Sequence, residues 1–183
     1  MRDIVDRLRE MFEGEGLRDY LGEDVSMAQH MLQAAVHART AGAPDYLVVA
    51  ALVHDIGHFT GVVSGRDLMS GKENHHDDAG ADWLATWFGP EITEPVRLHV
   101  AAKRYLCAVE PSYFDALSDA SVYTLGLQGG PMSAAEVAEF ENNPYHRDAI
   151  TLRRWEDAGK NADAPTLTFD EFMPAIRAVA IRV

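Results

Sequence analysis

The stretch Ala50-Ala51-Leu52-Val53-His54-Asp55-Ile56-Gly57-His58 determines how the rest of this chain is interpreted. Apolar residues precede His54 and a glycine follows Asp55, a pattern that predicts the buried end of a helix carrying an imidazole and a carboxylate inward. An ionised carboxylate in apolar surroundings is costly unless a cation or a metal balances it. Because further histidines lie upstream and downstream of this His-Asp pair, the pattern favours a metal.

Four histidines lie on predicted helices with apolar neighbours on the same helix face: His30, His54, His76 and His99. One such histidine alone is more commonly a hydrogen-bonded core residue than a ligand. Together with Asp55 and a late acidic residue, however, they form a ligand set suited to iron, manganese, zinc or nickel. A carboxylate next to His54 can bridge two ions, so the sequence predicts a dinuclear site with Asp55 as the bridge.

Apolar periodicity along the chain predicts an all-α fold, a helical bundle around that site. The chain has 183 residues and is 47% hydrophobic, which suits one substantial core, so we expect a single domain over 1–183. Ser26 with Gln29 is a capping-box pair that should start a helix. The Gly89-Pro90 pair should end another helix, and the next is expected to begin near Thr93. The glycine-rich stretch 59–73 is expected to be a loop that could close over a site.

Charge and composition exclude several classes of partner. The formal net charge is −13, from 29 acidic and 16 basic residues, which argues against binding nucleic acid. No stretch approaches the ~18 consecutive apolar residues of a membrane span, and the N-terminus lacks the apolar core of a signal peptide. We therefore expect a cytoplasmic protein, and the single cysteine, Cys107, agrees with a reducing compartment.

Several stretches resemble one family. The histidine and aspartate pattern resembles that of the HD-domain superfamily of helical metalloproteins. Further segments are similar to its mixed-valent di-iron oxygenases, which include myo-inositol oxygenase and, as the nearer match, the enzymes that split the carbon–phosphorus bond of 1-hydroxy-2-aminoethylphosphonates. The segments are Tyr20-Leu21-Gly22-Glu23, 54–58, His76 with Gly80-Ala81-Asp82, 99–106, 117–121, 128–132 and Arg153-Arg154-Trp155.

This resemblance implies two iron ions, in the Fe(II)/Fe(III) state, and dioxygen as co-substrate. The implied ligands are His30, His54, Asp55, His76, His99 and an acidic residue directly after Trp155, with Asp55 shared by both ions. The family has Asp at that last position, whereas this chain has Glu156 followed by Asp157. The ungapped spacing from Trp155 to Lys160 selects Glu156, and Asp157 remains the alternative.

The resemblance also implies a binding pocket for a small organophosphonate, formed by His58, Lys103, Ser121 and Arg153. In an acidic protein, a phosphonate dianion needs such local cations and hydroxyl or imidazole donors. The alternative for Lys103 is a solvated helix residue, and for Arg153 a surface ion pair with an adjacent acid.

Tyr20 and Glu23 lie in the loop before the first ligand helix. In the family this loop covers the oxygen-binding position and moves aside for substrate, and Glu23 could face the substrate's ammonium group. The alternative for Tyr20 is a half-buried loop aromatic.

The implied reaction inserts oxygen at C1 of a 1-hydroxy-2-(trimethylammonio or amino)ethylphosphonate, giving phosphate plus glycine betaine or glycine. An upstream hydroxylase acting on the parent phosphonate would supply the substrate. The sequence leaves the amine open between the two, with the quaternary ammonium favoured. Two other functions remain: an HD phosphohydrolase acting on a small phosphate ester or nucleotide, and a non-catalytic metal-binding or sensing domain.

Overall fold

The described part of the chain is helical. The computed structural model describes residues 3–20, 22–60 and 75–181, and within these ranges the only extended pairing is an isolated bridge between Asp19 and Ser26. The α-helices are α1 (Ile4–Glu13), α2 (Met27–Thr40), α3 (Asp45–Val53), α5 (His76–Leu84), α6 (Pro90–Val109), α7 (Pro111–Asp115), α8 (Asp119–Leu127), α9 (Ala134–Asn142), α10 (His146–Ala158) and α11 (Met173–Val179). Short 3-10 helices are η1 (Glu15–Leu17), η2 (Ile56–Phe59) and η3 (Phe169–Phe172). The predicted all-α fold is confirmed.

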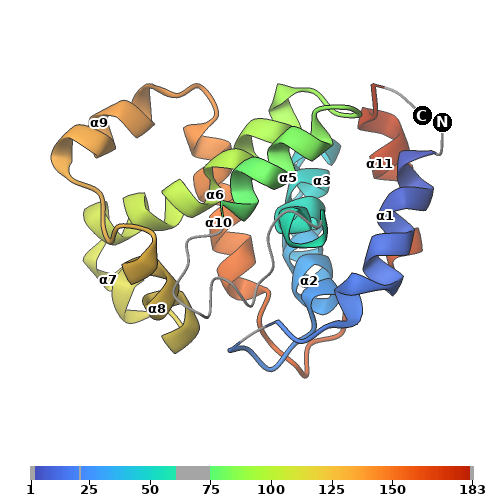
Figure 1. Ribbon diagram of the computed structural model, residues 1–183, viewed down its shortest axis with the longest axis horizontal. Helices are drawn as coiled ribbons and strands as arrows, with labels where there is room; N and C mark the ends of the chain where they lie inside the picture. Colours follow the sequence, from blue (N-terminus) through green and yellow to red (C-terminus); the bar gives the residue numbers. More distant parts are fainter. Residues whose placement is uncertain (1–2, 21, 61–74, 182–183) are drawn as a thin grey trace.

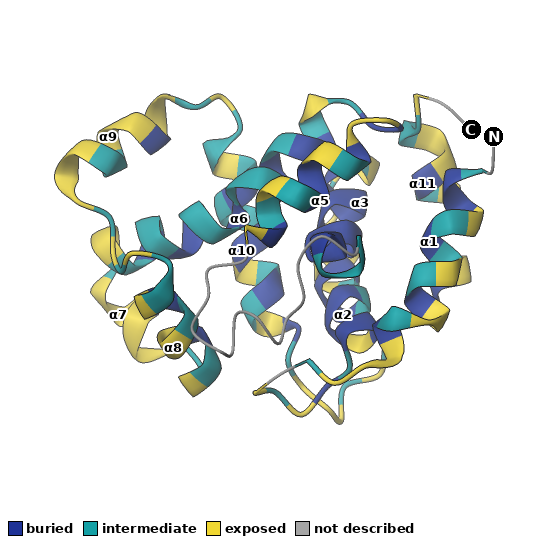
Figure 2. Ribbon diagram, in the orientation of Figure 1, coloured by how far each residue is buried: buried dark blue, intermediate teal, exposed yellow. Residues whose placement is uncertain are grey.

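Helix α3 forms the centre of the molecule. Every residue from Leu47 to Val53 is buried, as expected for a helix that is apolar on all sides. It packs against α2, α6, α10 and α11, and α6 also packs against α5 and α10. Figure 1 shows α1 and α11 on one side of this centre, near both chain ends, and α7, α8 and α9 on the other. The burial colouring in Figure 2 is darkest on α2 and α3.

The helix starts follow local sequence signals. Ser26 and Gln29 form both hydrogen bonds of the predicted capping box of α2. The helix expected near Thr93 begins earlier, at Pro90, because proline fits the first turn, where its missing N–H has no helical partner. The expected loop 59–73 lies almost entirely outside the described residues.

Two glycines allow α5 to approach η2 closely. A Cβ atom on Gly57 would lie 1.9 Å from the carbonyl oxygen of His76, and one on Gly80 would lie 3.1 Å from the backbone nitrogen of Gly57. Only glycine fits at position 57 without moving backbone. This contact brings the first residue of α5, His76, beside Asp55.

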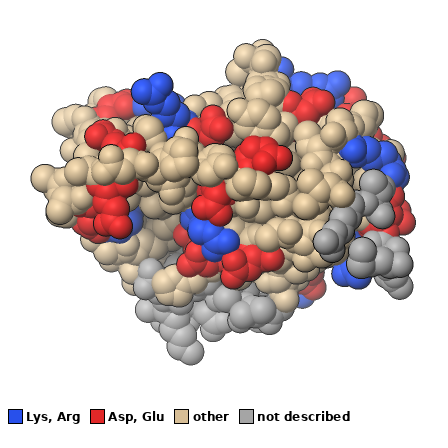
Figure 3. Space-filling model, turned by 90° about the horizontal axis from the view of Figure 1, so that it is seen from above, with Lys and Arg blue, Asp and Glu red and all other residues tan. Residues whose placement is uncertain are grey.

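The surface carries mixed charge. On the face that Figure 3 shows, lysine and arginine side chains stand among acidic ones rather than in one basic patch. Among the described residues, Arg97 pairs with Asp78, Asp82 and Glu94. None of the described helices has both the length and the apolar character that crossing a bilayer requires.

Candidate metal centre and adjoining cavity

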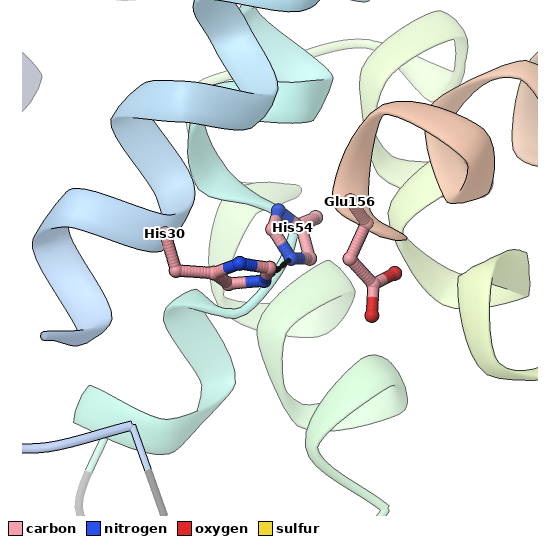
Figure 4. A group of neighbouring side chains, drawn as sticks. All are labelled: His30, His54 and Glu156. Atoms are coloured by element: carbon pink, nitrogen blue, oxygen red, sulfur yellow. Dashed lines mark hydrogen bonds between the residues drawn. The ribbon is translucent and has the colours of Figure 1, made fainter. Parts of the chain in front are cut away.

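Three buried side chains converge from three helices to form one possible metal site (Figure 4). His30 comes from α2, His54 directly follows α3, and Glu156 lies in the last turn of α10. One ligand atom of each lies within 4.8 Å of those of the other two. The set therefore offers two imidazole nitrogens and a carboxylate to one ion.

A second group of the same composition lies beside the first. It consists of Asp55, His76 at the start of α5 and His99 within α6, all buried. The Oδ1 atom of Asp55 lies 3.3 Å from Nε2 of His76 and 3.5 Å from Nε2 of His99. Its Oδ2 atom lies 3.6 Å from Nε2 of His30 and 3.4 Å from Nε2 of His54. One oxygen of Asp55 thus faces each group, as a bridging carboxylate would.

Backbone carbonyls orient three of the imidazoles. Nδ1 of His30 donates to the Gly159 carbonyl at 2.9 Å, Nδ1 of His54 to the Ala51 carbonyl at 2.8 Å, and Nδ1 of His99 to the Val96 carbonyl at 2.6 Å. A neutral imidazole that donates through Nδ1 keeps a lone pair on Nε2, the arrangement seen in metal-binding histidines.

The Nε2 atoms of His30 and His54 are 3.1 Å apart, as are those of His76 and His99. Two imidazole nitrogens that face each other at this distance need a proton or a cation between them. At a metal–nitrogen distance of ~2.1 Å, this separation subtends roughly a right angle at the ion. The histidine pairs therefore fit a metal on geometric grounds.

The electrostatics of the cluster also favour a cation. Burial alone would raise the pKa of Asp55, but the surrounding histidines hold it well below its usual value. Burial would lower the pKa of His99, yet hydrogen bonding to Asp55 and the charge of Glu156 raise it to about 9. Oδ2 of Asp55 and Oε2 of Glu156 are buried and have no hydrogen-bond donor among the described residues. Positive charge is favoured at this place.

The two adjacent acids of α10 occupy different environments. Glu156 is 3% exposed and belongs to the first group, whereas the Asp157 side chain is 23% exposed and contacts Arg153 and the Tyr113 hydroxyl. The structure thus brings Glu156, and not Asp157, to the histidines.

A small cavity of ≈ 50 Å³ opens beside both groups. Four residues predicted for the phosphonate pocket, His58, Lys103, Ser121 and Arg153, lie on its wall. The full lining is Tyr20, Asp55, His58, His76, His99, Val100, Lys103, Ser121, Thr124, Gln128, Arg153 and Glu156. The solvated alternative for Lys103 is wrong, because the residue is 3% exposed; Arg153 does pair with both adjacent acids, but in the interior.

Thr124 and Gln128 on this wall were missed as site residues from sequence. Thr124 accepts a hydrogen bond from Nζ of Lys103 at 2.8 Å, and Oε1 of Gln128 is buried without a donor among the described residues. Their spacing from Ser121, three and seven residues on, is that of one helix face and could have indicated them. Gln128 directly follows α8, in a stretch whose glycines and proline indicate a turn.

Burial tunes two groups on the wall. It lowers the pKa of Lys103 to about 7, helped by the nearby positive charge of Arg153. Burial and the neighbouring histidines lower the pKa of His58 to about 3, so its imidazole is neutral near pH 7. Nδ1 of His58 is buried without a partner among the described residues. Among these residues, Arg153 is a permanent cation, Lys103 a titratable one and His58 a neutral imidazole.

Tyr20 and Glu23 lie on different sides of this wall. The Tyr20 ring lines the cavity and stacks on the His30 imidazole, with ring centroids 4.3 Å apart. Glu23 is outside the lining set, and its Oε1 accepts hydrogen bonds from Nζ of Lys160 at 3.0 Å and from Oγ of Ser118 at 2.6 Å. Lys160 also donates to Oγ of Ser121 at 2.8 Å. Glu23 therefore does not line the cavity but contacts Lys160, which in turn contacts the lining residue Ser121.

Comparison with known proteins gives matches over most of the chain. The family model for the HD domain matches residues 27–128. A [1-hydroxy-2-(trimethylamino)ethyl]phosphonate dioxygenase (glycine-betaine-forming) from Leisingera caerulea is 47% identical over 175 residues, covering 96% of this chain and 89% of that protein. A hydroxymethylphosphonate dioxygenase from Gimesia maris is 45% identical over 163 residues, covering 85% of this chain and 78% of that protein.

Proposed function

This chain belongs to the HD-domain family, and on that premise we propose that it is an oxygenase that uses dioxygen to cleave the carbon–phosphorus bond of a small 1-hydroxyphosphonate. The two relatives named as phosphonate dioxygenases favour this function over that of a general HD phosphohydrolase. The observation that carries it is the Asp55 carboxylate between two pairs of imidazoles, at the wall of a cavity that also presents Lys103 and Arg153.

We propose that the six predicted ligands hold two iron ions: His30, His54 and Glu156 one of them, His76 and His99 the other, with Asp55 between. Each group contains two histidines and one carboxylate. This ligand set leaves coordination positions open and is typical of non-heme iron oxygenases, whereas structural zinc sites are closed by four ligands. When bound, iron supplies the redox chemistry that dioxygen activation requires.

The protein's own residues would bind the phosphonate and exclude water. Arg153 and protonated Lys103 offset the negative charge of the phosphonate, and Ser121 and His58 provide hydrogen bonds. The chain's formal charge of −13 makes this local positive charge necessary. The Tyr20 ring covers the side next to His30, so a bound substrate would be held away from bulk water and in a fixed orientation.

The proposed reaction is balanced without a further reductant. A 1-hydroxyphosphonate and dioxygen together contain all the atoms of a carboxylate and phosphate. The bonds that break are C1–H, C1–P and O–O; C1 is oxidised to the carboxylate and dioxygen is reduced. The C1 hydroxyl must already be present, so a hydroxylase acting on the parent phosphonate would supply the substrate.

The identity of the substrate depends on the group attached to C1 of the phosphonate. We propose 1-hydroxy-2-(trimethylammonio)ethylphosphonate as the first substrate to test, giving glycine betaine, with the primary amine, giving glycine, as the second. The relative from Leisingera caerulea is named for the trimethylamino compound, whereas the one from Gimesia maris is named for a phosphonate without an amine. A single domain and a cytoplasmic location remain predictions.

The test uses anaerobically purified, iron-loaded protein. Each phosphonate is added with dioxygen, and released phosphate and consumed dioxygen are measured together; equal amounts are expected for the true substrate. Mössbauer or EPR spectra before and after addition should show a coupled Fe(II)/Fe(III) pair that changes with that substrate. Hydrolysis of phosphate esters with manganese or zinc, with no oxygen-dependent phosphate release, would establish the phosphohydrolase instead. One metal or none per chain, without turnover, would indicate a sensing domain.

A further inference from the structure

Arg153 lies between the candidate metal centre and the cavity wall. It is 3% exposed, and its Nη1 donates to Oε1 of Glu156 at 2.6 Å. Its Nη2 donates to Oδ1 of Asp157, and its Nε donates both to Oδ2 of Asp157 at 3.2 Å and to the Tyr113 hydroxyl at 3.0 Å. The guanidinium thus contacts two carboxylates and a phenol.

Asp157 and Tyr113 form one unit around this arginine. The Tyr113 hydroxyl donates to Oδ2 of Asp157 while it accepts from Nε of Arg153. The two oxygens of Asp157 meet Nε and Nη2, which is the bidentate side-on geometry that fixes a planar guanidinium most firmly. Tyr113 lies in α7 and is 8% exposed, so this contact also ties α7 to α10.

Arg153 keeps two N–H groups that no described residue engages. A guanidinium has five N–H groups, and the contacts within the described residues use three of them. One N–H on Nη1 and one on Nη2 remain, and Arg153 lines the cavity. Each of these two N–H groups can donate to an oxygen of a tetrahedral anion in the cavity.

We propose that Asp157 and Tyr113 are positioning residues that hold Arg153 so that its two remaining N–H groups reach the cavity and bind the phosphonate. This rests on the proposed function for the identity of the anion. In this proposal Asp157 acts on Arg153. It does not bind a metal ion, which is the alternative role that the sequence left open for it.

Removal of Asp157 distinguishes this role from simple electrostatics. If only charge mattered, loss of a carboxylate near an anion site would strengthen anion binding. If Asp157 holds Arg153, its loss frees the guanidinium to turn toward Glu156, and anion binding weakens. The two ideas predict opposite signs for the same substitution.

The experiment measures binding of inorganic phosphate to iron-loaded protein by anaerobic calorimetry, together with iron content. We expect Asp157→Asn to weaken phosphate binding by roughly tenfold, as for loss of a charge-assisted hydrogen bond, with iron content unchanged. Tyr113→Phe keeps the ion pair and should weaken binding by a smaller factor in the same direction. Asp148→Asn makes the same charge change nine residues earlier on α10, and it should have no effect.

Turnover separates the failure of this proposal from that of the proposed function. With the phosphonate as substrate, Asp157→Asn should raise KM by a larger factor than it lowers kcat. Unchanged or tighter phosphate binding in Asp157→Asn overturns the proposal while the wild-type oxygenase activity stands. Loss of iron in a folded Asp157→Asn protein also overturns it. If the wild-type protein binds phosphate with the expected effect of Asp157→Asn but turns over no phosphonate, only the proposed function fails.

Discussion

Nδ1 of His30 on α2 donates a hydrogen bond of 2.9 Å to the carbonyl oxygen of Gly159, which directly follows α10. Gln33, one turn along α2, holds the next part of the chain: its amide donates to the Asn161 carbonyl at 2.7 Å and accepts from the Asn161 N–H at 3.1 Å. The end of α10 is therefore fixed against α2. This contact sets the orientation of a candidate ligand on α2 and the position of Glu156 on α10 together.

Substitution of Gly159 by alanine should disturb this contact. The added Cβ would lie 3.0 Å from the His30 carbonyl oxygen and 3.1 Å from the Ala34 nitrogen, so α2 and the end of α10 would have to move apart by a few tenths of an ångström. We expect a loss of about 1–3 kcal/mol in the free energy of unfolding and a weaker metal affinity, by about tenfold or more. Denaturant unfolding and metal titration measure these changes.

Gly126→Ala is the matched control for that variant, because a Cβ there meets nothing within 4 Å. It should leave metal affinity unchanged. Equal metal affinity in Gly159→Ala and wild type would contradict the role given to this carbonyl.

Glu156→Gln should remove one metal ion. The carboxylate is buried with one oxygen unpaired, and Arg153 with the nearby histidines holds its pKa at about 2 against the effect of burial, so it is ionised and available as a ligand. An uncharged amide is a weaker ligand. Metal analysis after extensive dialysis is expected to give about one ion per chain for Glu156→Gln and two for wild type; Glu171→Gln, an exposed acid, is the control. Two tightly held ions in the Gln variant would exclude Glu156 as a ligand.

Phosphonate binding should weaken as pH rises through neutrality. Lys103 has a pKa lowered by burial to about 7, so below this pH it is charged and attracts the anion, and above it the charge is lost. KM should rise between pH 7 and 8.5, by at most about tenfold per unit for one proton. The Lys103→Arg variant stays charged and should show a flatter profile. A wild-type pH profile of KM as flat as that of the arginine variant would show that Lys103 does not lose its proton in this pH range.

The ion pair between Glu23 and Lys160 should influence which substituent the site accepts on C2 of the substrate. Both side chains are 11% exposed, so the pair is largely shielded from water. Among the described residues, Lys160→Met would leave the Glu23 carboxylate with its Ser118 hydrogen bond alone, able to attract an ammonium. We expect KM for the trimethylammonio substrate to fall about threefold or more relative to KM for hydroxymethylphosphonate, which has no amine. Lys160→Arg keeps the charge and should preserve the ratio; an unchanged ratio in Lys160→Met would show that Glu23 does not contact this group.

Several helices and four of the metal-facing residues followed from local pattern. Apolar spacing predicts which face of α2 and α6 is buried, and His30 and His99 lie on those faces. The run from Leu47 to Val53 is apolar on every side, which is why α3 is central and delivers His54 and Asp55 to the interior. Helix α6 begins at Pro90, three residues before the start expected near Thr93.

The sequence by itself determined the residue types of the site, because two-His-one-carboxylate chemistry depends on composition and on burial that periodicity reveals. Only the tertiary structure decided which acidic side chain contacts which partners. Glu156 and Asp157 are neighbours of the same charge, and their side chains point in different directions around α10, one to the histidines and the other to Arg153 and Tyr113. The ion-pair partner of Glu23 could not be predicted from local sequence either, because Lys160 lies 137 residues away along the chain. Contacts between helices distant in sequence depend on packing, which no local pattern encodes.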